Sequence, residues 1–262
     1  SILVGSGSTD VGGNINVGAG VSDPQTGGSV SLATGSGTAS SSGSIVLRTL
    51  NAGDTGMSGF MRFSTGTSSS GSSGTTRFYS GAANAGKSGR ILLSIGDGTT
   101  LDGGDVNVEA GLSSQASGNV GGEVSVTSGA GTGSTASDGG HMVLTSGIGA
   151  SRTGGSMSLA TGFGTATSTG SVILKTDNAG VSGMSGYLSF HTGTASSGSS
   201  GKMVFASGNA NEGRGGSVVV SVGTGTTSDG GDISFSTGDT NELTGGTISL
   251  SAMHGTTKSS GS

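Results

Sequence analysis

The chain of 262 residues contains no cysteine and no tryptophan, and it has a single proline. The missing cysteines exclude a disulfide framework, a thiolate zinc site and a catalytic thiol. Aromatic residues make up 3% of the chain, and no apolar run approaches the roughly 20 residues that span a bilayer as a helix. The formal net charge is −5 without a basic stripe, which argues against nucleic acid and anionic membrane surfaces as partners.

Glycine takes the place of the missing residue types, with 59 glycines against a hydrophobic content of 29%. Low hydrophobicity is typical of disordered chains, but such chains also carry high net charge and many prolines. Because each glycine loses more entropy on folding than any other residue, we expect a dense network of backbone hydrogen bonds to compensate. The composition therefore predicts a β structure that is held together mainly by backbone hydrogen bonds.

One phrase recurs along the whole chain, as T-G-G-S-V-S-L-A-T-G at Thr26–Gly35 and as T-G-G-S-M-S-L-A-T-G at Thr153–Gly162. We call the glycine before each strand signal the anchor glycine and the next residue position +1. Most anchors lie 15 residues apart, and the longer steps fall in the Ser/Gly/Thr-rich connections. The anchors are Gly13, Gly28, Gly43, Gly59, Gly74, Gly89, Gly104, Gly122, Gly140, Gly155, Gly170, Gly186, Gly201, Gly216, Gly231 and Gly246.

Apolar residues occupy positions +2 and +4 of almost every repeat, and position +6 is usually Thr, Ser or Ala. Side chains of a strand alternate between its two faces, so +2, +4 and +6 form an inner face and +1, +3 and +5 an outer face. The inner face is the predicted core. Its apolar pairs are Val30/Leu32, Ile45/Leu47, Met61/Phe63, Ile91/Leu93, Val106/Val108, Val124/Val126, Met157/Leu159, Val172/Leu174, Leu188/Phe190, Ile233/Phe235 and Ile248/Leu250.

A longer period indicates an internal duplication of 28–154 and 155–262 within one continuous domain, 1–262. Residues 28–111 match residues 155–238 with a constant offset of 127, and the 127-residue unit 28–154 spans eight predicted strands. An even number of strands suits a coil that holds two of them. The chain does not begin with Met, and its two ends together resemble the join between one connection and the next strand. We therefore expect it to be a segment of a longer array.

These patterns predict an all-β fold, a parallel β-solenoid of about 15-residue strand-plus-corner repeats with two strands per coil, which form a flat two-sheet solenoid. One 15-residue repeat per coil is the alternative. A third arrangement, an antiparallel meander, is disfavoured because the connections are longer than those of typical hairpins.

Two local predictions follow from the two-strand coil. Phe63 faces Phe78 and Phe190 faces Phe205, so that replacing Phe63 or Phe190 with Ala costs about 3–5 kcal/mol in a packed core. The anchor glycines occupy corners that need positive φ or close backbone approach between stacked coils, and Gly155→Ala is expected to break one such corner.

Motifs for catalysis or cofactor binding are missing from the sequence. It has no phosphate-binding G-x-x-x-x-G-K-[ST] loop and no nucleophile elbow, so we expect no catalytic residues, no cofactor and no enzyme activity. Two D-G-G-D stretches are weak candidates for cation binding at a corner, although turn capping is the commoner role of such aspartates. The four residues are Asp102, Asp105, Asp229 and Asp232.

Aliphatic residues also reach the outer face in some repeats. Four of them, at position +3, fall on alternate repeats of one parity, where they would form exposed apolar patches on one sheet. Such patches commonly mark interfaces. We therefore hypothesise lateral association through Val46, Val143, Ile173 and Val204.

The pattern G-G-x-[VI]-x-[LVF]-x-[TS]-G over nearly the whole chain resembles the Gly/Ser/Thr-rich tandem-repeat β-solenoids of giant extracellular surface and fibre proteins, including adhesins. The resemblance implies an extracellular or cell-surface location and a structural role. The expected function is that of a shaft segment in an extracellular filament, appendage or matrix fibre, with copies of the chain stacked end to end. The alternative is a surface adhesin or an ice-binding module.

Overall fold

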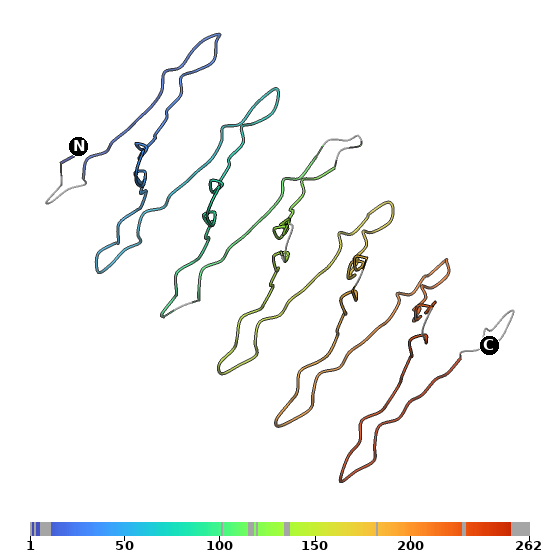
Figure 1. Cartoon of the computed structure of the whole chain (residues 1–262). Helices are drawn as coiled ribbons and strands as arrows, with labels where there is room; N and C mark the ends of the chain where they lie inside the picture. The colour runs from blue at the N-terminus through green and yellow to red at the C-terminus, as the bar shows by residue number, and fades with distance from the viewer. Residues whose placement is uncertain are drawn as a thin grey trace. The chain divides into compact units, whose positions relative to one another are not determined.

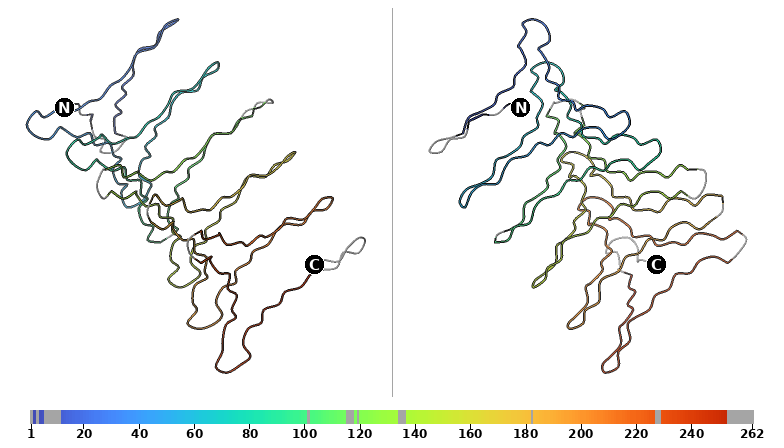
Figure 2. Two further views of the ribbon diagram at one scale, coloured as in Figure 1. Left: turned by 45° about the vertical axis from the view of Figure 1, so that its right-hand side comes forward. Right: turned by 60° about the vertical axis from the view of Figure 1, so that its left-hand side comes forward.

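The computed structural model describes residues 2, 4–5, 12–100, 102–114, 118, 120–133, 137–181, 183–226 and 229–252. These residues contain no helix and no strand. They form extended segments joined by loops, with short bends such as 23–25 and 38–40 at the loop tips. Figure 1 draws them as a plain trace, and two further views show extended segments running side by side toward a rounded tip (Figure 2).

The chain divides into two compact units, Ser1–Ser128 and Gly129–Ser262. Several loops in each unit are closed at their base by one backbone hydrogen bond, in which an anchor glycine N–H donates to the carbonyl of a glycine that ends the previous extended segment. In the first unit these bonds run from Gly13 to Gly5, Gly28 to Gly20, Gly43 to Gly35 and Gly122 to Gly111. In the second unit they run from Gly140 to Gly129, Gly155 to Gly147 and Gly246 to Gly238.

The predicted β-solenoid is wrong for the described part of the chain. A solenoid needs each strand to pair with the strand of the next coil about 4.8 Å away. The backbone hydrogen bonds among the described residues instead stay within single loops, at separations of eight or eleven residues. Since no strand is present in those ranges, the two-strand coil, the 15-residue coil and the meander are all absent from them.

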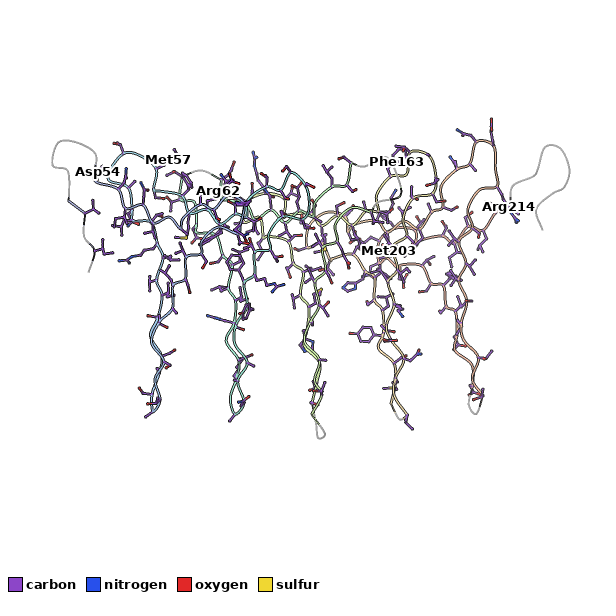
Figure 3. All side chains as sticks on the ribbon, turned by 90° about the horizontal axis from the view of Figure 1, so that it is seen from above. Asp54, Met57, Arg62, Phe163, Met203 and Arg214 are labelled. Atoms are coloured by element: carbon purple, nitrogen blue, oxygen red, sulfur yellow. The ribbon has the colours of Figure 1, made fainter. Side chains whose placement is uncertain are left out.

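The predicted core is also wrong, because no described residue is buried. The apolar inner-face residues keep from 41% (Met203) to 86% (Leu250) of their surface exposed. Residues in the connections are more exposed still, as Met57 is at 95%. Figure 3 draws the side chains as sticks along the ribbon, with Met57 on a loop. The physical reason is that an inner face is covered only when another segment packs on it.

The predicted alternation of faces is nevertheless visible in the side-chain exposure. Ile45 at +2 is 52% exposed, whereas its neighbour Val46 at +3 is 74% exposed. The same order holds in every repeat that carries an aliphatic +3 residue, as in Val172 against Ile173. The +2 side chains are thus more shielded than the +3 side chains beside them.

The anchor glycines serve close approach rather than positive φ. A Cβ atom placed on Gly155 would lie 3.2 Å from the Gly147 nitrogen and 3.3 Å from Ser146 Cβ. Positive φ angles occur instead at glycines outside the anchor set, such as Gly56 at 127° and Gly183 at 145°. Neither reason predicted for glycine at the anchors holds as stated, because the close contact lies across the base of one loop and not between stacked coils.

Candidate functional site

The inner faces of two consecutive segments meet near the base of a loop, and the phenylalanine pairs show this most clearly. Phe63 and Phe78 lie edge to face, with their ring centroids 6.1 Å apart and their planes at 83°. Phe190 and Phe205 repeat the arrangement in the second unit, at 6.5 Å and 80°. The predicted pairings are therefore present. The predicted burial of these rings in a core is wrong, since the Phe63 side chain remains 59% exposed.

The residue at +6 lies against the anchor glycine of the next repeat. A Cβ on Gly74 would lie 3.2 Å from Thr65 Cγ2, and a Cβ on Gly231 would lie only 2.7 Å from Val222 Cγ1. In three repeats the +6 hydroxyl also donates a hydrogen bond to the carbonyl of that glycine. The bonds are Ser80 Oγ to Gly89 O at 2.9 Å, Thr176 Oγ1 to Gly186 O at 3.1 Å and Ser207 Oγ to Gly216 O at 2.9 Å.

This hydroxyl contact was not anticipated from the sequence. The signal that could have found it is the preference of +6 for Thr, Ser and Ala opposite a residue without a side chain. A Thr or Ser at +6 fits beside the anchor glycine and can reach its carbonyl. The glycine leaves the space, and the hydroxyl supplies the hydrogen-bond donor. In these three loops the hydroxyl bond joins the two sides of the base, whereas in other loops the glycine-to-glycine backbone bond does so.

The candidate cation site at the D-G-G-D stretches gains no further ligands from the fold. Among the described residues, no three His, Cys, Asp or Glu side chains come together in a group that could hold a metal ion. Calcium takes six to eight oxygen ligands, which two carboxylates alone do not supply. The role of Asp102, Asp105, Asp229 and Asp232 in cation binding stays a prediction.

The outer-face residues proposed for lateral association are accessible. The side chains of Val46, Val143, Ile173 and Val204 are between 65% and 80% exposed. Their exposure does not separate them from the inner face, since the inner-face residues are exposed as well. Lateral association through these four residues stays a prediction.

Cavities and membrane-spanning helices are not features of the described ranges. No pocket opens among these residues. In the same part of the chain, no helix has the length and apolar character needed to cross a membrane. The surface available for interaction is therefore made of the extended segments and their loops.

Comparison with known proteins adds no relative: no protein-family model, no curated protein and no solved structure matches the chain. The class of the protein therefore has to be inferred from its own repeat and from the geometry of its loops.

Proposed function

We propose that the protein is a structural protein, a repeating segment of an extracellular or cell-surface filament, appendage or matrix fibre. Copies of the same chain are its partners. The observation that carries the proposal is the 15-residue repeat, which runs from one end of the chain to the other without a chemically distinct exception. A uniform repeat of this kind is typical of a protein that builds length in an assembly, whereas a catalytic or binding site needs particular residues in one place.

The surface chemistry of the repeat also favours a structural role. Each repeat has an apolar inner face that is too small for the repeat to fold alone. Repeat proteins gain stability when neighbouring units cover such faces. Charged residues make up only 10% of the chain, so little like-charge repulsion opposes close association of copies. The resemblance to repetitive surface and fibre proteins supports the extracellular location.

Assembly of the purified chain tests the proposal. A concentration series is followed by analytical ultracentrifugation and electron microscopy, and we expect filaments above a critical concentration. A chain that sediments as a monomer at every concentration would contradict the structural role. Antibody labelling of intact and permeabilised source cells tests the location, which requires labelling before permeabilisation.

A further inference from the structure

The accessible surface of the chain is far larger than a folded protein of its size exposes. The chain exposes 26193 Å². From its mass of 24.5 kDa, a compact monomer would expose about 10,000 Å² and a fully extended chain about 36,000 Å². An excess of about 16,000 Å² is several times the 2,000–5,000 Å² that obligate interfaces commonly bury. A partner that covered this surface would contact the chain along most of its length.

The extended segments also offer their backbone groups for pairing. Folded proteins form about one internal hydrogen bond per residue, but the backbone bonds within the described ranges stand only at the bases of loops. Between those bases, segments such as 44–50 present N–H and C=O groups in an extended conformation. An extended segment of this kind is a template for pairing with another segment.

From these two observations we infer that copies of this chain associate side by side along their length. Extended segments of one copy pair through backbone hydrogen bonds with extended segments of another, and the association covers the apolar inner faces of both. The inference rests on the proposed function, because it specifies how copies of a structural protein meet. The pairing is between chains, and it differs from the single-chain solenoid that the described residues do not form.

A second copy is the occupant that fits this surface best. The inner face repeats every 15 residues along the whole chain, and only a partner with the same period can match it from end to end. A contact between chain ends would reach the terminal repeats alone, and it would leave the inner faces of the central repeats exposed. The net charge of −5 over 262 residues allows copies to approach closely.

Backbone pairing between copies is tested by mixing two isotopically labelled preparations of the full chain before assembly, one with ¹⁵N and the other with ¹³C. Solid-state NMR then measures ¹⁵N-to-¹³C magnetisation transfer, which arises only between copies. We expect transfer from backbone amides of one copy to carbonyls of another. Assembled material without such transfer would overturn the inference and leave the proposed function standing. A chain that never assembles would overturn both.

The covered face is tested with two neighbouring aliphatic residues, one on each face. Ile45→Asn places an amide on the inner face, and Val46→Asn places one on the outer face of the same segment. Because about half of the Ile45 side chain remains to be covered, we expect Ile45→Asn to raise the critical concentration about tenfold. Val46→Asn should change it less than twofold. The reverse order would overturn the assignment and put the contact on the outer face.

Discussion

Replacement of the anchor glycine Gly231 by alanine is the sharpest probe of the loop base. The new Cβ would lie 2.7 Å from Val222 Cγ1, whereas ordinary van der Waals contacts begin near 3.4 Å. Val222 is β-branched and has little rotamer freedom with which to yield. Overpacking of this kind costs about 1–3 kcal/mol. We therefore expect Gly231→Ala to destabilise the protein.

The preceding glycine provides the matched control. No atom lies within 4 Å of a Cβ built on Gly230, and its φ is outside the left-handed region. Alanine there restricts the unfolded chain without a clash, which stabilises proteins by about 0.4–1 kcal/mol. The same entropy gain acts at Gly231 but is smaller than the overpacking cost. Two neighbouring Gly→Ala changes are thus expected to shift stability in opposite directions.

Urea-induced unfolding measures the free energy of unfolding of both variants. The protein concentration is kept fixed, because the stability of an associating protein depends on it. The internal duplication offers a replicate: a Cβ on Gly104 would lie 2.8 Å from Ile95 Cγ2, and Gly103 has open space around it. Adding Val222→Ala should rescue Gly231→Ala by removing the overlapping methyl group. Equal effects of Gly230→Ala and Gly231→Ala would refute the close contact at the loop base.

Two further predictions concern contacts across the loop. A double-mutant cycle with Phe63→Ala and Phe78→Ala should give a coupling free energy of about 0.5–1.5 kcal/mol in urea unfolding, as expected for an edge-to-face pair, and zero coupling there would contradict the pairing. Ser207→Ala removes the donor to the Gly216 carbonyl and should lower the free energy of unfolding in urea by about 0.5–1 kcal/mol. Ser217→Ala on the outer face serves as the control. Equal losses of stability for both serines would argue against the bond.

Much of the local organisation could be predicted from the sequence because it depends on residues close together in the chain. The alternation of apolar and polar residues correctly separated Ile45 from Val46 by face. The two-strand coil placed Phe63 opposite Phe78, and the pair is present without that coil because the two segments that carry it are consecutive in the chain. Glycine at the anchors indicated close approach, because a position without a side chain permits two segments to meet, but the contact lies across the base of a loop and not between stacked coils.

The strand pairing could not be predicted in the same way. The alternation of apolar and polar residues in a segment indicates which side chains share a face. It does not indicate which other segment pairs with it through backbone hydrogen bonds. Val30 and Leu32 show a regular strand pattern whether their partner is the next coil, another chain or water. A burial cost of 3–5 kcal/mol for Phe63 assumed a packed core, and the exposed ring retains only the energy of its pair within the chain. The Ser207 contact was missed because hydroxyl residues also suit turns and surfaces.

The glycine-to-glycine bond that closes several of the described loops has a consequence for how the protein can be altered. The bond from Gly122 to Gly111 spans eleven residues and measures 2.8 Å, whereas the bond from Gly28 to Gly20 spans eight and measures 2.9 Å. Lengthening a loop from eight to eleven residues adds only about 0.3 kcal/mol of closure entropy. Loop tips such as 23–25 are accordingly suitable sites for inserted epitopes, tags or modified residues, since added length there leaves the closure at the base unchanged.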